Sequence, residues 1–70
     1  MNDLLADALP PVSLKDQISC VGREIAMRKR VYPHWIRNGR MKEGAAREEI
    51  RRMEAVLATL QNIQGHEKGK

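Results

Sequence analysis

Apolar residues recur at helical spacing in two long segments of the chain. In residues 14–31 they come at steps of four, three and four, within about 60° of arc on a helical wheel. In residues 42–63 the steps alternate between four and three, within about 80° of arc. Runs of β-branched and aromatic residues that would build strands are missing, so the pattern predicts an all-α fold. The two stripes consist of Leu14, Ile18, Val21 and Ile25, and of Ala46, Ile50, Met53, Leu57 and Leu60.

Capping and breaking residues predict where these helices begin and end. Ser13 is a typical N-cap, and Asp16 three residues later suits the positive end of a helix. Pro33 removes a backbone donor, so we expect the first helix to end near residue 31 and a short helical turn to follow over 33–38. Gly39 suits the left-handed position after a helix end. The chain is therefore predicted to form a helical hairpin, two long helices joined by a short helical elbow.

The segments outside the two stripes have different characters. Two prolines at positions 10 and 11 force an extended connection and mark residues 1–12 as an N-terminal arm before the hairpin domain at 13–63. We expect residues 64–70 to form a disordered polar tail. The arm is expected to pack on the hairpin through Leu4, Leu5 and Leu9.

A second apolar stripe predicts self-association. Cys20, Met27 and Val31 lie roughly 120° from the first stripe, so a single partner helix cannot cover both. The second neighbour is the N-terminal arm, the short middle helix or another protomer. Val56 and Ile63 similarly widen the stripe of the last helix. A chain of 70 residues has a modest core, and its one cysteine cannot form an internal disulfide. We therefore predict a homodimer that pairs through these five residues.

Positive charge is concentrated in the middle of the chain. The net charge is +4, and residues 23–52 carry ten Lys and Arg against four Glu. Such a segment attracts phosphate or an acidic protein surface. Glu43 precedes Arg47 by four residues, and Glu48 precedes Arg52 by four, so these arginines are expected to form ion pairs on a solvated face. The predicted partner-binding surface is a basic elbow made of Arg23, Arg28, Lys29, Arg30, Tyr32, His34, Trp35, Arg37 and Arg40.

The two aromatic residues of this elbow admit two interpretations. Beside arginines, Tyr32 and Trp35 are what a nucleotide or a single strand would stack on. Alternatively, they close the end of the core together with Ile36, and the arginine side chains extend over them. We favour packing, because a small domain with two aromatic residues needs both. A helix-turn-helix that reads DNA is disfavoured, because its turn of three or four residues is shorter than the predicted connection.

The sequence contains no set of residues that predicts catalysis or a cofactor. His34 and His66 are 32 residues apart, and Cys20 has no partner at metal-ligand spacing. Ser13 is accounted for as a cap, and a glycine-rich phosphate loop after a strand is missing. We therefore predict a protein that is not an enzyme and binds neither metal nor cofactor. Without a signal peptide or an apolar stretch of about 20 residues, we expect a cytoplasmic protein that does not enter membranes.

A group of motifs in residues 23–60 resembles a widespread group of small phage and prophage proteins. The most specific element is Met-Arg-x-x-Val-Tyr-Pro at 27–33, with Gly-Arg-Met at 39–41. Gly44 departs from the pattern, because better helix formers are expected in that first turn. The resemblance implies a phage context but brings no activity or binding residue. The other matching residues are Arg23, Glu24, Ile25, Ala26, Trp35, Glu48, Glu49, Ile50, Met53, Glu54, Ala55, Val56 and Leu57.

This context leads to a functional prediction. Many tiny helical phage proteins bind and disable or redirect a host protein, and inhibitors of defence systems are among them. We predict a phage accessory protein that binds a host or phage protein in the cytoplasm of the infected or lysogenic bacterium. The alternative is nucleic-acid or nucleotide binding through the basic elbow. A third reading is a structural or assembly factor of the virion.

Overall fold

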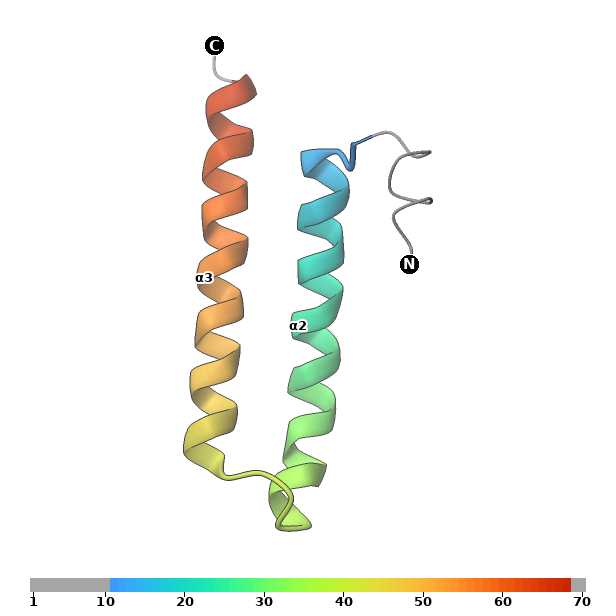
Figure 1. Ribbon diagram of the computed structural model, residues 1–70, viewed down its shortest axis with the longest axis vertical. Helices are drawn as coiled ribbons and strands as arrows, with labels where there is room; N and C mark the ends of the chain where they lie inside the picture. The colour runs from blue at the N-terminus through green and yellow to red at the C-terminus, as the bar shows by residue number, and fades with distance from the viewer. Residues whose placement is uncertain (1–10, 69–70) are drawn as a thin grey trace, which may run out of the picture.

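The computed structural model describes residues 11–68, which form two long helices. Helix α2 spans Leu14–Arg37 and helix α3 spans Glu43–Lys68. Figure 1 shows them side by side and antiparallel, joined at one end by a short connection. No strand occurs within residues 11–68. The predictions of an all-α fold and of a two-helix hairpin are confirmed.

The start of α2 follows from its capping residue. Ser13 has an extended backbone, and its side-chain oxygen accepts a hydrogen bond of 3.0 Å from the backbone N–H of Asp16. Asp16 also places a negative charge in the first turn, where the helix dipole favours it. Both expectations from the sequence are confirmed.

The end of α2 differs from the prediction. The helix does not stop near residue 31 but continues through Pro33 to Arg37, so residues 33–37 are its last turns rather than a separate elbow helix. Proline costs the hydrogen bond that its missing N–H would donate to residue 29. Tyr32 is buried and Ile36 half-buried, one on each side of the proline. Their packing toward α3 stabilises the helical turn that the proline weakens.

A Schellman motif ends α2 after Arg37. Asn38 is the C-cap, and Gly39 has a left-handed backbone with φ of 76°. The N–H of Gly39 donates to the carbonyl oxygen of Ile36 over 3.1 Å, and the N–H of Arg40 donates to that of Trp35 over 2.8 Å. These are the two bonds that define the motif. The predicted role of Gly39 is confirmed, and the chain reverses direction within residues 38–42.

The two predicted apolar stripes face each other, but the core between them is thin. All nine stripe residues are buried or half-buried. Only Ile25, Tyr32 and Ala46 are less than 9% exposed among the described residues, and no side chain there is fully enclosed. A hairpin with so few buried side chains has little hydrophobic stabilisation of its own.

The observed end of α3 differs from the predicted one, and the predicted arm lies mostly outside the described residues. Helix α3 continues to Lys68, beyond the expected end at residue 63, so residues 64–68 are helical rather than part of a polar tail. Residues 1–10, with the arm leucines, lie outside the described residues, as do residues 69–70. Neither α2 nor α3 is long and apolar enough to cross a membrane.

Candidate partner-binding surfaces

Two ion pairs between the helices mark the two flanks of the hairpin. Arg28 Nη1 lies 3.2 Å from Glu49 Oε2, and Lys29 Nζ lies 3.0 Å from Glu54 Oε2. Because consecutive helical residues are about 100° apart, Arg28 and Lys29 emerge on opposite sides of the contact between α2 and α3. The predicted basic elbow is therefore divided, and each of these two side chains is held by an acidic residue.

Arg28 is the centre of a charged cluster on its flank. Besides Glu49, its guanidinium lies 3.4 Å from Glu24 Oε1 and donates a hydrogen bond of 3.4 Å to the hydroxyl oxygen of Tyr32. The bond to Tyr32, followed by the interactions with Glu24, raises the pKa of Arg28 above its ordinary value. Arg28 is thus committed to internal contacts and contributes little free charge to a partner.

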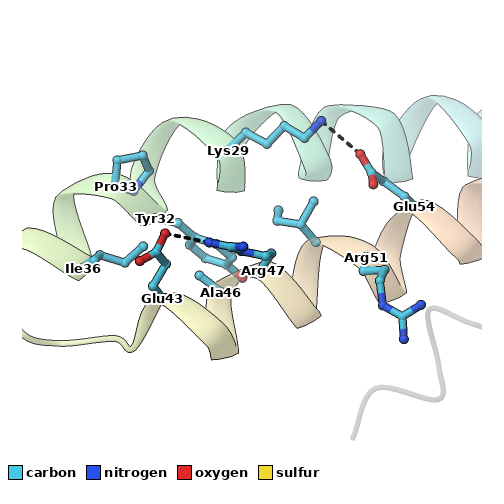
Figure 2. A pocket seen from close by; sticks show the side chains of 10 residues that line it. Lys29, Tyr32, Pro33, Ile36, Glu43, Ala46, Arg47, Arg51 and Glu54 are labelled. Carbon is cyan, nitrogen blue, oxygen red and sulfur yellow. Dashed lines mark hydrogen bonds and ion pairs between the residues drawn. The ribbon is translucent and has the colours of Figure 1, made fainter.

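The other flank carries a groove of about 440 Å³ near the turn of the hairpin. Its floor is apolar and is formed by Tyr32, Pro33, Ile36, Ala46 and Ile50. Figure 2 shows two ion pairs beside this floor, Lys29 with Glu54 and Glu43 with Arg47, the latter 2.7 Å apart. An apolar side chain that entered the groove would therefore lie between two ion pairs.

Three arginines form a row on the outer face of α2, which we call the arginine ridge. Arg23, Arg30 and Arg37 follow one another at intervals of seven residues, so they keep nearly the same direction along about 21 Å of helix. They lie roughly 120–180° around the helix from the buried Ile25 and Tyr32. All three are exposed, and no acidic side chain within residues 11–68 pairs with them.

Two neighbours complete the ridge at its turn end. Arg37 Nη2 lies 3.0 Å from His34 Nδ1, and because arginine only donates, that imidazole nitrogen must accept. Arg40 is exposed in the connection just beyond α2 and also has no acidic partner among the described residues. The ridge and Arg40 thus place four exposed arginines without an acidic partner among the described residues on and beside the outer face of α2.

The aromatic residues do not share this surface. The rings of Tyr32 and Trp35 lie 5.7 Å apart between centroids and are tilted by 36°. Tyr32 is only 7% exposed and therefore presents almost no surface to a partner. Trp35 packs against Tyr32 but is itself 40% exposed, so it covers the end of the core only in part. It lies about 140° around the helix from Arg30, because five residues separate the two.

The predicted self-association residues all lie on the flank that carries Arg28 and Glu49. Val56 and Ile63 follow Glu49 by seven and fourteen residues, and Trp35 follows Arg28 by seven, so each pair of positions shares a side of its helix. The sequence did not assign Trp35 to this surface, although its spacing from Arg28 was a usable signal. We call this surface the apolar flank; it consists of Cys20, Met27, Val31, Trp35, Val56 and Ile63.

The predicted surface pairs of α3 are also present. Glu43 pairs with Arg47, while Glu48 lies 3.3 Å from both Arg51 Nε and Arg52 Nε. Hydrogen bonding from Arg51, with added attraction from Arg52, lowers the pKa of Glu48 below its ordinary value. Each of these arginines has an acidic partner, although Arg51 and Arg52 share one, whereas the ridge arginines have none among the described residues.

Within residues 11–68, no group of three or more His, Cys, Asp or Glu is placed to hold a metal ion. Comparison of the chain with known protein families, curated proteins and solved structures finds no match. The resemblance to small phage proteins therefore stays a prediction from the motifs.

Proposed function

We propose that this chain is a small, non-enzymatic phage accessory protein that binds an acidic surface of a host protein through the arginine ridge. One observation carries the proposal: Arg23, Arg30 and Arg37 are aligned and exposed, and no acidic side chain of the described residues neutralises them. Unpaired charge in a row raises the association rate with an oppositely charged partner and selects its orientation.

The spacing of the ridge favours a protein partner. Side chains seven residues apart on one helix meet side chains seven residues apart on another, as in the ion pairs that flank coiled coils. An acidic helix with carboxylates at this repeat would match Arg23, Arg30 and Arg37 in turn. We infer that the host protein presents such an acidic helix on its surface. By covering this helix, the phage protein would change the activity of the host protein.

Nucleic-acid or nucleotide binding is the weaker alternative. Stacking proteins place aromatic faces beside their basic groove. Here Tyr32 is 7% exposed, and the exposed Trp35 points to a different side of α2 from Arg30. A surface of arginines without accessible rings fits carboxylates better than bases.

The proposal also includes a homodimer and a role inside the infected or lysogenic host. Dimer formation is supported by the thin core, in which three residues are less than 9% exposed. The cellular setting rests on the resemblance to phage proteins.

Affinity capture from host lysate, treated with nuclease, tests the proposed function. Three chains serve as bait: the wild type, a ridge variant with Arg23→Gln, Arg30→Gln and Arg37→Gln, and a control variant with Arg47→Gln, Arg51→Gln and Arg52→Gln. Both variants lose three positive charges. We expect the wild type and the control to retain the same host protein and the ridge variant to lose it. With that protein purified, the Kd should rise about tenfold or more for the ridge variant alone.

Two other outcomes would overturn the proposal. Equal binding by all three chains would mean that the ridge is not the contact. Binding of duplex or single-stranded oligonucleotides that weakens steeply between 50 and 200 mM salt would instead establish the alternative.

A further inference from the structure

The apolar flank exposes several large apolar side chains, although the core of the hairpin is small. Met27 is 39% exposed, Val56 51% and Ile63 45%, and Trp35 adds a large ring at 40%. Cys20 is exposed as well, and Val31 is half-buried. Both helices contribute to this surface, which therefore runs across the hairpin rather than along one helix. Large apolar side chains exposed on one side of a soluble protein are typical of interaction sites.

The spacing on this flank is that of a helix-packing seam. Met27 follows Cys20 by seven residues, and Ile63 follows Val56 by seven. Val31 and Trp35 continue the α2 row at steps of four. A repeat of seven keeps apolar side chains directed at a neighbouring helix that runs nearly parallel or antiparallel. The flank is therefore shaped to receive two further helices.

The amount of buried surface indicates that the neighbour is a second copy of this chain. A two-layer arrangement of helices needs each apolar stripe covered, and a hairpin supplies only one layer. Within residues 11–68 no side chain is fully enclosed, and small domains with so little burial commonly gain stability by oligomerisation. A second hairpin on the apolar flank would give the four-helix arrangement in which such stripes form a common core.

The charged cluster on the flank is compatible with being covered. Arg28 pairs with Glu24 at 3.4 Å and with Glu49 at 3.2 Å, so the carboxylates and the guanidinium already have partners. Covering paired charges costs far less than covering a lone one, and such a polar cluster favours one register of packing over others. The opposite flank is less suited, because ion pairs lie on both sides of its apolar groove.

We propose that two copies of this chain associate through the apolar flank, face to face about a twofold axis, to form a four-helix bundle. The inference rests on the homodimer of the proposed function and names its interface. In the twofold assembly each copy contributes the same surface, with Met27, Val31 and Trp35 from α2 and Val56 and Ile63 from α3. The arginine ridge borders this interface, because Arg23 and Arg30 line one pocket together with Met27, and the dimer presents two ridges along its edges.

Sedimentation and tryptophan fluorescence of the full chain test this assembly. Trp35 is the only tryptophan and lies on the flank, so its emission should shift to shorter wavelength as association removes it from water. We expect the wild type to sediment at twice the mass of a single chain at micromolar concentrations and to show this shift on concentration. Its thermal midpoint should rise with protein concentration, because a higher concentration shifts the equilibrium from unfolded monomers toward the folded dimer.

Matched variants identify the face. Met27→Glu and Val56→Glu each place a charge within the flank, whereas Ala26→Glu and Ala55→Glu place the same charge one residue away on exposed sides of the same helices. We expect the first two to sediment as monomers without the Trp35 shift, and the other two to behave as the wild type. Circular dichroism of each variant reports whether loss of association is accompanied by loss of helix.

The possible failures are distinguishable. A wild type that sediments as a monomer and shows no change in Trp35 emission would overturn both the dimer and this interface, while leaving binding by the ridge to its own test. A dimer that survives Met27→Glu and Val56→Glu would keep the homodimer and overturn the flank as its interface. These measurements need no host partner, so they do not depend on the outcome of the affinity capture.

Discussion

Arg28 of α2 and Glu49 of α3 meet across the hairpin, with the arginine Nη1 3.2 Å from the glutamate Oε2. Their side chains are 30% and 39% exposed, which makes this the less solvated of the two ion pairs that join the helices. Arg28 also donates a hydrogen bond to the hydroxyl of the buried Tyr32, so the ion pair is connected to the core. The contact links the surface charge of the middle segment to the core.

A double-mutant cycle should detect this coupling. We expect Arg28→Ala and Glu49→Ala each to lower the thermal midpoint, and the double variant to lower it by less than the sum, because the interaction is lost only once. A parallel cycle on Lys29 and Glu54, which are 56% and 49% exposed, should show weaker coupling because solvent screens it more strongly. Additive effects at Arg28 and Glu49 would contradict a stabilising pair.

Substitution of two glycines by alanine should have opposite effects. Gly39 has φ of 76°, so a Cβ there costs about 1–2 kcal/mol. Gly44 lies in the first turn of α3, and an added Cβ would meet nothing within 4 Å. Gly44→Ala should therefore stabilise the fold by about 0.5–1 kcal/mol. Thermal or urea unfolding measures both changes, and a stabilised Gly39→Ala variant would mean that the Schellman motif does not end α2.

Enlarging Ala46 should destabilise the hairpin. Ala46 is 5% exposed where α3 packs on Tyr32, and it keeps the helices close at the turn end. Ala46→Leu adds volume to a packed site and should cost about 1–3 kcal/mol of the free energy of unfolding. Ala55→Leu, at an exposed position of the same helix, should change stability by less than about 0.5 kcal/mol. Similar effects at both positions would show that the core is loosely packed.

Acidification should weaken the charged face of α3 through Glu48. Hydrogen bonding from Arg51, with attraction from Arg52, lowers the pKa of Glu48 below the ordinary value of 4.5. A lowered pKa means that the folded state binds the proton less tightly than the unfolded state. The stabilisation is therefore complete well above pH 4.5 and is lost as the pH falls through the lower, folded value.

NMR titration of the Glu48 side chain checks this directly. The titration midpoint should lie below 4.5 at low salt and move toward it as salt screens the exposed arginines. A Glu48→Gln variant should show a smaller change in stability across the same pH range. A midpoint at or above 4.5 in low salt would mean that the pairs with Arg51 and Arg52 do not persist in solution.

Local patterns of the sequence were sufficient to predict the two-helix hairpin, although not the residues at which α2 and α3 end. Ser13 and Gly39 begin and end α2 through contacts within a few residues, and such contacts can be inferred from residue type and spacing. The alternation of apolar and polar residues similarly identified both faces that meet between α2 and α3. The pair Glu43 and Arg47 was predictable for the same reason, since both partners lie on one helix.

The candidate surfaces depend on how α2 and α3 pack against each other, which no local sequence pattern contains. The sequence around Pro33 predicted the end of a helix. In the structure α2 continues, because the stabilisation from packing Tyr32 and Ile36 toward α3 outweighs the loss of the hydrogen bond that the proline removes. This continuation of α2 brings Arg37 into line with Arg23 and Arg30, and turns Trp35 toward the flank of Arg28. The residues of the predicted basic elbow are thus divided between the arginine ridge, the flank of Arg28 and the opposite flank with Lys29.

By itself, the sequence determined the helices, their caps and the faces that join them, because these follow from backbone geometry repeated over a few residues. Only the tertiary structure decided which charges are free. Arg28 and Lys29 are neutralised by Glu49 and Glu54, which are distant in sequence and approach only when α3 folds back on α2. No acidic side chain of the described residues pairs with the arginine ridge, because the ridge faces away from α3, and this direction is set by how the two helices pack.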